Sequence, residues 1–211
     1  MNSLIKRIDE IIEEKSLLKH PFYQLWSEGN LSLDSLVGYS KEYFQLVKSV
    51  PSFMSPIIEK APKSLKNELI SNQDEETQHI IPWKKFAYSL GVDENDLDNY
   101  AGLPKTMLAV SKLSSLMNSF EGGSCAMYAF EKEIPKISKI KLEGLAEFYG
   151  ISSEYATEYF KLHMEADIRH AASWSKVLEH ASSKKEELLE IAEKSISAQN
   201  MLLDSCYESY C

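Results

Sequence analysis

The sequence predicts an all-helical fold, a single bundle of about seven to nine helices, on three observations. Apolar residues recur three and four positions apart along most of the chain, as at Leu4, Ile8 and Ile12 near its start. Alternating apolar and polar runs, which are typical of strands, are missing, as are the Asn-Gly and Asp-Gly pairs of tight hairpins. Glycine is scarce, with 8 residues in 211, and falls mostly between the periodic segments.

The first half of the chain is predicted to form five helices. Ser32 precedes one of them and supplies an N-cap. Pro51 and Pro56 fall inside the pattern of that helix and predict kinks or a break, because proline cannot donate the intrahelical hydrogen bond. The five predicted helices cover residues 2–18, 21–28, 32–59, 62–80 and 82–90.

The second half is predicted to form four more helices, over residues 104–118, 120–149, 152–180 and 183–208. Gly122 and Gly123 interrupt the second of these, which indicates either a helix boundary or a close approach of the backbone to another group. Pro135 predicts a further kink or break, and the Ser152–Glu154 run supplies an N-cap. We expect residues 204–211 to form a mobile tail.

Length and composition favour a single domain over residues 1–211, because a chain of this size buries enough surface to fold without staples. The formal charge is −9 and no Lys/Arg cluster is present, so nucleic acid is not an expected partner. No apolar run approaches the roughly 20 residues of a membrane span, and the first residues do not resemble a secretory signal. Three cysteines without a C-x-x-C pair favour a reducing, cytoplasmic location.

The segment His163–His170 carries the clearest chemical signal. At about 100° per residue, His163, Asp167 and His170 share one narrow stripe of a helix. Two imidazoles and a carboxylate at that spacing suit a transition metal with mixed nitrogen and oxygen ligands, such as iron or manganese. The alternative is a solvated polar face.

Two further segments carry candidate ligands. His79 follows Glu75 by four residues and Glu76 by three, so either carboxylate can join the histidine at a metal. Glu131 ends an apolar run, and a buried carboxylate is costly unless it finds a metal or a partner. Helical bundles build di-metal carboxylate sites from such residues on several helices. The candidate ligands are Glu75, His79, Glu131, His163, Asp167 and His170.

These motifs resemble those of the CADD-like proteins, which are heme-oxygenase-like di-metal oxidases of the TenA/PqqC superfamily. The resemblance covers about residues 5–180 and rests on the H-M-E-A-D-I-R-H stretch, the run from Tyr128 to Pro135, and the run from His20 to Trp26. It implies a heme-oxygenase-like helical bundle and the six metal ligands named above. CADD-like proteins carry a few more residues between the acid and the histidine of the Glu75–His79 segment. A three-residue deletion nearly preserves a helix face, which favours Glu75 over Glu76.

The resemblance also implies an activity. CADD-like proteins are self-sacrificing p-aminobenzoate synthases for folate biosynthesis, in which an Fe/Fe or Mn/Fe centre and an external reductant activate O₂. One tyrosine of the chain supplies the ring and one lysine supplies the amine. The matching residues are Tyr23 for the ring, Lys141 for the amine and Tyr159 as a redox tyrosine. A further family tyrosine is replaced here by Phe130, so a radical relay through that position is not expected.

The residues alone leave other interpretations open. Tyr23 can be a packing residue, and Lys141 can be a solvated surface lysine. The alternative functions are a di-metal oxidase of an external small molecule, a TenA-like or PqqC-like enzyme without this metal chemistry, and an interaction protein that binds a helical partner. The sequence also leaves open the identity of the metals and whether the protein forms a homodimer.

Overall fold

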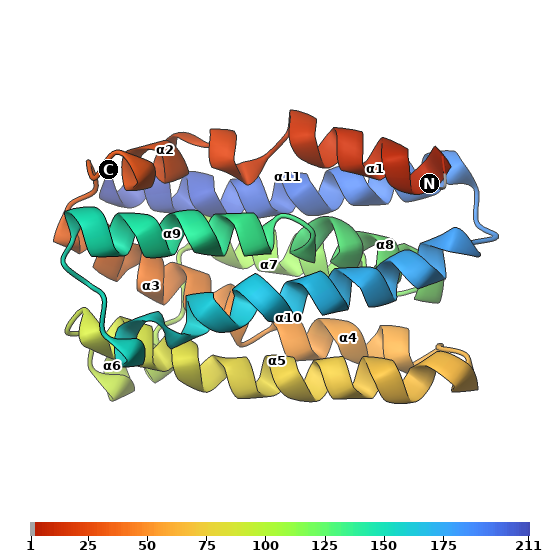
Figure 1. Ribbon diagram of the computed structural model, residues 1–211, viewed down its shortest axis with the longest axis horizontal. Helices are drawn as coiled ribbons and strands as arrows, with labels where there is room; N and C mark the ends of the chain where they lie inside the picture. The colour runs from red at the N-terminus through yellow and green to blue at the C-terminus, as the bar shows by residue number, and fades with distance from the viewer. Residues whose placement is uncertain (1–2) are drawn as a thin grey trace.

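Helices account for all the regular structure in the computed structural model, which describes residues 3–211 (Figure 1). No strand occurs within these residues, as predicted. In chain order the elements are α1 (Ser3–Glu14), the short 3-10 helix η1 (Leu17–Lys19), α2 (Pro21–Ser27), α3 (Leu33–Val47), α4 (Val50–Glu59), α5 (Lys63–Ser89), α6 (Glu94–Asn99), α7 (Pro104–Ser115), α8 (Phe120–Glu131), α9 (Ile134–Phe148), α10 (Glu154–Glu179) and α11 (Lys185–Tyr210).

Local sequence signals explain most helix ends. The side chains of Ser32, Ser119 and Ser153 accept hydrogen bonds from backbone N–H groups in the first turns of α3, α8 and α10. Pro51 and Pro135 lie in the first turns of α4 and α9, where proline suits a helix start. The breaks predicted at these two prolines are therefore confirmed, and each of the two long predicted helices is a pair.

Three local predictions were wrong. The expected boundary between residues 80 and 82 is absent, because α5 continues through Pro82, which is buried in the bundle. The short helix α6, capped by Asp93, lies in a segment for which no helix was predicted. The expected mobile tail is the last part of α11, where Cys206 is fully buried and the Tyr210 carbonyl accepts a hydrogen bond from Ser35.

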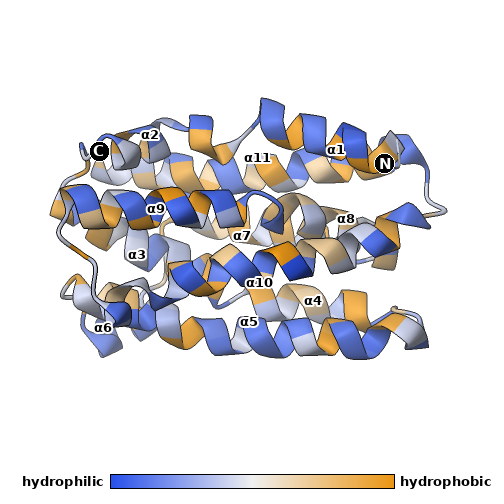
Figure 2. Ribbon diagram, viewed as in Figure 1, coloured by the Kyte–Doolittle hydropathy of each residue, from blue (hydrophilic) through white to orange (hydrophobic). Residues whose placement is uncertain are grey.

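Helix α10 occupies the middle of the bundle and packs against α5, α8 and α9 (Figure 1). Helix α11 packs against α3, α7 and α8 and carries the chain back along the length of the molecule. Figure 2 shows apolar and polar residues alternating around the outer helices, as expected for helices with one buried face. No helix within residues 3–211 combines the length and the apolar character that crossing a membrane requires.

Close helix contacts position the interior. A Cβ added to Gly123 in α8 would lie 2.6 Å from Cγ1 of Ile57 in α4, so the glycine permits the two helices to approach. Because Gly123 also lies in the first turn of α8, both sequence interpretations of this segment are correct. All three tryptophans are fully buried, and the indole of Trp174 donates a hydrogen bond to Glu131 at 2.6 Å.

Candidate metal centre

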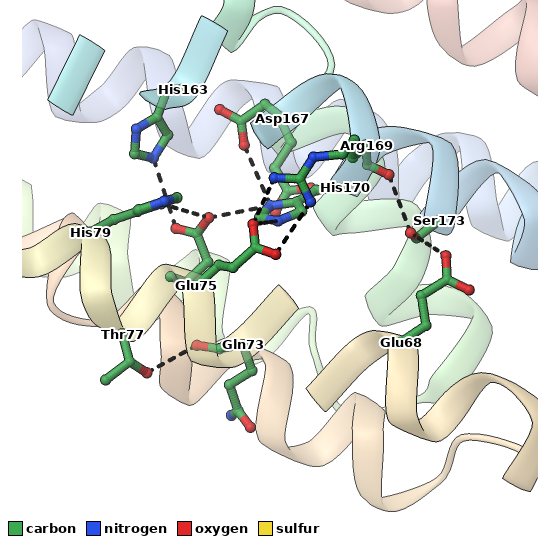
Figure 3. Close-up of polar contacts among 12 residues, drawn as sticks. Glu68, Gln73, Glu75, Thr77, His79, His163, Asp167, Arg169, His170 and Ser173 are labelled. Atoms are coloured by element: carbon green, nitrogen blue, oxygen red, sulfur yellow. Dashed lines mark hydrogen bonds and ion pairs between the residues drawn. The ribbon is translucent and has the colours of Figure 1, made fainter. Parts of the chain in front are cut away.

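Helices α5 and α10 lie side by side, and their facing surfaces carry most of the predicted ligands (Figures 1 and 3). The structure brings the predicted ligands together at one place in the bundle, and all except Glu75 are buried. They are Glu75 and His79 from α5, Glu131 from α8, and His163, Asp167 and His170 from α10.

Glu76 is the acid at the centre of this cluster. Its Oε1 atom lies 3.2 Å from Nδ1 of His79 and 3.2 Å from Nδ1 of His170. Its Oε2 atom lies 3.9 Å from Nε2 of His163. One buried carboxylate therefore approaches three histidines that come from two helices.

The ligand atoms form two groups that share Glu76. One group is Glu76, His79 and His163, the other is Glu76, Asp167 and His170, and within each group the atoms lie within 4.8 Å of one another. Mixed imidazole and carboxylate donors suit iron and manganese. The arrangement therefore fits two neighbouring metal ions with Glu76 between them.

Unsatisfied polar atoms concentrate at the same place. Within residues 3–211, eight buried side-chain atoms lack a hydrogen bond, and five of them belong to this cluster. Leaving a buried polar group unpaired costs about 1–3 kcal/mol, so such a concentration is unfavourable unless the atoms bind something. The five atoms are Oε1 of Glu76, Nδ1 of His79, Oε1 of Glu131, Oδ2 of Asp167 and Nδ1 of His170. Metal coordination would satisfy them.

The electrostatics of the cluster also favour cations. Burial, reinforced by the charge of Glu76, raises the pKa of Glu131 to about 8 and that of Asp167 well above its usual range. Burial opposes ionisation of Glu76 too, but the imidazoles of His163, His170 and His79 around its carboxylate hold its pKa well below the usual value. Bound cations would favour the ionised form of all three carboxylates.

The structure places Glu76, and not Glu75, at the centre of the cluster. The Glu75 carboxylate accepts two hydrogen bonds from Arg169, at 2.8 and 3.2 Å, and its side chain is 30% exposed (Figure 3). A step of one residue turns a helix by about 100°, which places Glu76 inside and Glu75 at the rim. Glu75 still contacts the cluster, because its Oε2 lies 3.3 Å from Nε2 of His170.

His163 is held by Tyr159, one turn earlier on α10. Its Nδ1 atom lies 2.8 Å from the Tyr159 carbonyl oxygen, so the ring donates there and presents Nε2 to Glu76. The Tyr159 ring stacks on the imidazole with centroids 4.0 Å apart. Tyr159 thus lies against a candidate ligand, where a redox tyrosine was predicted.

Glu131 and Phe130 line a small cavity beside the cluster. One Glu131 oxygen accepts the Trp174 N–H and the other has no hydrogen bond. The cavity has a volume of about 10 Å³, which is space for no more than one water-sized molecule. Its other walls are Tyr43, Leu46, Val47, Val50, Glu76, Ile134, Tyr159, His163 and Asp167.

Tyr23 and Lys141 meet elsewhere in the core. Lys141 is 4% exposed, so its interpretation as a surface lysine is wrong, and its Nζ atom donates to the Tyr39 hydroxyl at 2.5 Å. The same Nζ lies 4.7 Å from the centroid of the Tyr23 ring, and the Tyr23 and Tyr39 hydroxyls are 3.2 Å apart. Burial lowers the pKa of Lys141 to about 7, so a substantial neutral fraction exists at neutral pH.

Packed aromatic rings connect the Lys141 pocket with the metal cluster. The ring centroids of Tyr39 and Tyr43 are 5.2 Å apart, and Tyr43 stacks on Trp83 at 4.8 Å. Trp83 meets Tyr159 edge-on at 4.7 Å, and Tyr159 stacks on His163. A continuous path of ring contacts therefore runs from the tyrosines around Lys141 to a candidate ligand.

Comparison with known proteins identifies the family of this chain. Residues 37–200 match the family described as iron-containing redox enzymes. The chain belongs to this family. It is 32% identical to a 4-aminobenzoate synthase from Nitrosomonas europaea over 229 aligned positions, which cover 100% of this chain and 93% of the relative. It is 36% identical to a 4-aminobenzoate synthase from Chlamydia pneumoniae over 187 positions, which cover 85% of this chain and 83% of the relative.

Solved structures confirm that this family member has the predicted heme-oxygenase-like fold. A TenA homologue from Pseudomonas syringae pv. tomato superposes with a TM-score of 0.86 at 15% identity, covering 98% of this chain and 93% of the other. A CADD-like protein of unknown function from Nostoc punctiforme superposes with a TM-score of 0.75 at 20% identity, covering 99% and 97%.

Sequence reasoning assigned no functional role to the three aromatic residues of this interior path, which are Tyr39, Tyr43 and Trp83. Tyr39 and Tyr43 are four residues apart and share one helix face, which was an available signal. Their proximity to Lys141 depends on the packing of α3 against distant helices, which no local pattern shows.

Proposed function

We propose that this iron-containing redox enzyme is a self-sacrificing 4-aminobenzoate synthase with a two-metal centre. The observation that carries the proposal is the buried contact of the Lys141 amine with Tyr23, two residues that an external-substrate enzyme does not need to bring together. The names of the two relatives support the product, and the shared Glu76 supports two metal positions.

The metal-binding residues of the proposal are Glu76, His79, Glu131, His163, Asp167 and His170. Bound by them, iron or iron and manganese would supply O₂ activation with electrons from an external reductant. The chain's own part is to hold the imidazoles and carboxylates in place, and to limit the space beside them to a cavity of about 10 Å³.

The substitution pattern of the product fits Tyr23. In 4-aminobenzoate the amine is para to the carboxyl group, as the hydroxyl of tyrosine is para to Cβ. Conversion therefore requires a C–N bond in place of the phenolic C–O bond, cleavage of the Cα–Cβ bond, and oxidation of Cβ to the carboxyl carbon by O₂. Lys141 supplies the nitrogen: its Cε–Nζ bond breaks, and O₂ oxidises Cε to an aldehyde. The phenolic oxygen leaves as water, and Cα of residue 23 stays in the chain with a hydrogen in place of Cβ.

Tyr39 orients both reacting side chains. Its hydroxyl accepts the hydrogen bond from Lys141 and lies within hydrogen-bond distance of the Tyr23 hydroxyl. The surrounding aromatic rings exclude water and keep a neutral fraction of the amine available as a nucleophile. Tyr159, stacked on His163, is the redox tyrosine of the proposal.

Isotope labelling tests this proposal. We expect protein made with ¹³C-tyrosine and ¹⁵N-lysine, loaded with iron and manganese and exposed to O₂ with a reductant, to release 4-aminobenzoate that carries both labels. Tyr23→Phe and Lys141→Met should release none. Tyr128→Phe is the matched control, because Tyr128 is also buried but bonds to Asp9. Normal release from Tyr23→Phe would contradict the proposal.

One observation favours a second candidate, a di-metal oxidase of an external small molecule. A groove of about 760 Å³ runs along the outer side of α5 and α10 and reaches His79 and Glu75. A substrate held there would be turned over many times while the mass of the chain stayed constant. Intact-mass measurement before and after the reaction distinguishes the two functions.

A further inference from the structure

His170 is contacted on both sides of its ring by carboxylates. Its Nδ1 atom lies 3.2 Å from Glu76 and 3.7 Å from Asp167, so this nitrogen faces the candidate metal position. Its Nε2 atom lies 3.3 Å from Oε2 of Glu75 on the opposite side. The ring itself is fully buried, so its orientation depends on these neighbours.

Glu75 is fixed by Arg169, the residue directly before His170. The two terminal guanidinium nitrogens, Nη1 and Nη2, donate to Oε1 and Oε2 of Glu75 at 3.2 and 2.8 Å (Figure 3). A carboxylate that accepts two hydrogen bonds from one guanidinium group is held in a fixed orientation. Two consecutive residues of α10 therefore hold one side chain of α5, with Arg169 outside and His170 inside.

The geometry points to Glu75 as a positioning residue of the Asp167–His170 metal position: it accepts the Nε2–H of His170 and so presents the Nδ1 lone pair of that ring to the metal. This inference rests on the proposed two-metal centre. A carboxylate that accepts the outer N–H of a ligand histidine fixes its tautomer and makes it a stronger donor. Glu75 thus acts through His170.

The two candidate metal positions differ in the group that accepts the outer N–H of a ligand histidine. In the other group, the outer nitrogen of His163 donates to a neutral backbone carbonyl, that of Tyr159. At His170 the acceptor is an anionic side chain, so the Asp167–His170 position has the more strongly polarised histidine. Loss of Glu75 should therefore weaken one metal position and leave the other.

Titration of metal-stripped, full-length protein with Co²⁺, followed by visible absorption, tests this difference. For wild type we expect two binding events. For Glu75→Ala we expect one dissociation constant to rise about 10–100-fold, with a changed absorption band, while the other stays constant. Glu75→Gln keeps an acceptor oxygen and should restore part of the lost affinity.

Glu68→Ala is the matched control. Glu68 also joins α5 to α10, through Ser173 (Figure 3) and through Lys176, but contacts no histidine. If Glu75 acted only by joining the helices, both variants would change Co²⁺ binding alike, which would overturn the inference. A fall from two bound ions to one at saturating Co²⁺ in Glu75→Ala would make Glu75 a ligand and would also overturn it.

The tautomer of His170 provides a second readout, which separates this inference from the two-metal proposal. In ¹⁵N NMR spectra of the diamagnetic, Zn²⁺-loaded protein we expect His170 to bind the metal through Nδ1 and to carry its proton on Nε2 in wild type, and we expect this Nε2–H proton to exchange faster with solvent in Glu75→Ala. A proton on Nδ1 in wild type would overturn the inference even if two metals bind. If the tautomer is as expected but wild type binds fewer than two Co²⁺ ions, the two-metal proposal fails instead.

Discussion

At the scale of single residues, Lys141 combines a chemical role with a cost in stability. Its amine is buried among Tyr23, Tyr39 and Tyr43, and burial lowers its pKa from the usual 10.5 to about 7. A folded chain that binds this proton more weakly than the unfolded chain is destabilised at every pH below about 10. The neutral amine that the proposed chemistry needs therefore comes at the expense of stability.

Lys141→Met should stabilise the metal-free protein, by on the order of 4 kcal/mol at pH 7. Between about pH 7 and 10.5 the unfolded chain holds more of this proton than the folded chain, so the stability of wild type rises with pH. The gain from the substitution should accordingly fall by about half at pH 9. Urea unfolding at pH 7 and pH 9 measures this gain in the free energy of unfolding, and Lys139→Met, at an exposed lysine, is the control. A gain independent of pH would contradict the assigned burial effect.

At the scale of elements, the contact between α5 and α10 buries groups that suit metal binding but lower the stability of the metal-free protein. Glu76 approaches the histidines of both helices, while Asp167 and Glu131 are buried without full hydrogen bonding. A metal-free bundle thus contains several unfavourable groups that bound cations would compensate.

Asp167→Asn should therefore stabilise the metal-free protein, by about 1–3 kcal/mol, and remove most of the stabilisation that metal gives to wild type. Thermal unfolding with and without Mn²⁺ measures both effects. Asp204→Asn is the control, because Asp204 lies half exposed beside His20, away from the cluster. A metal-free Asp167→Asn protein less stable than wild type would show that the carboxylate is structural.

The approach of α8 to α4 is a second property of elements. Gly123→Ala should destabilise the protein by about 1–3 kcal/mol, because the new Cβ would lie 2.6 Å from the Ile57 side chain. Ile57→Val should destabilise the protein less in the Gly123→Ala background than alone, since the smaller side chain relieves part of the overlap with the new Cβ. Chemical denaturation of the four proteins in this cycle measures the coupling. Additive effects would show that the two residues do not compete for space.

At the scale of the whole molecule, the sequence was informative where a property depends on helical period. The stripe of His163, Asp167 and His170 and the helix starts at Ser32 and Ser153 were found correctly for that reason. Helical period alone does not show which of the adjacent acids Glu75 and Glu76 faces inward, so this feature could not be predicted from the sequence.

Long-range packing decided the remaining features. The surroundings of Lys141 combine α2, α3, α9 and α10, so no local pattern could distinguish this buried amine from a surface lysine. The end of α11 likewise appears polar in sequence but packs against α3. Pro82 is the reverse case, where a local breaker is overridden by burial within a long helix.

The central claim is that the chain consumes its own side chains, and the yield of product per chain tests it most directly. After aerobic reaction of the metal-loaded protein, we expect at most one 4-aminobenzoate per chain. We also expect an intact-mass change that maps to Tyr23 and Lys141. Many product molecules per chain, formed with both side chains intact, would contradict the account.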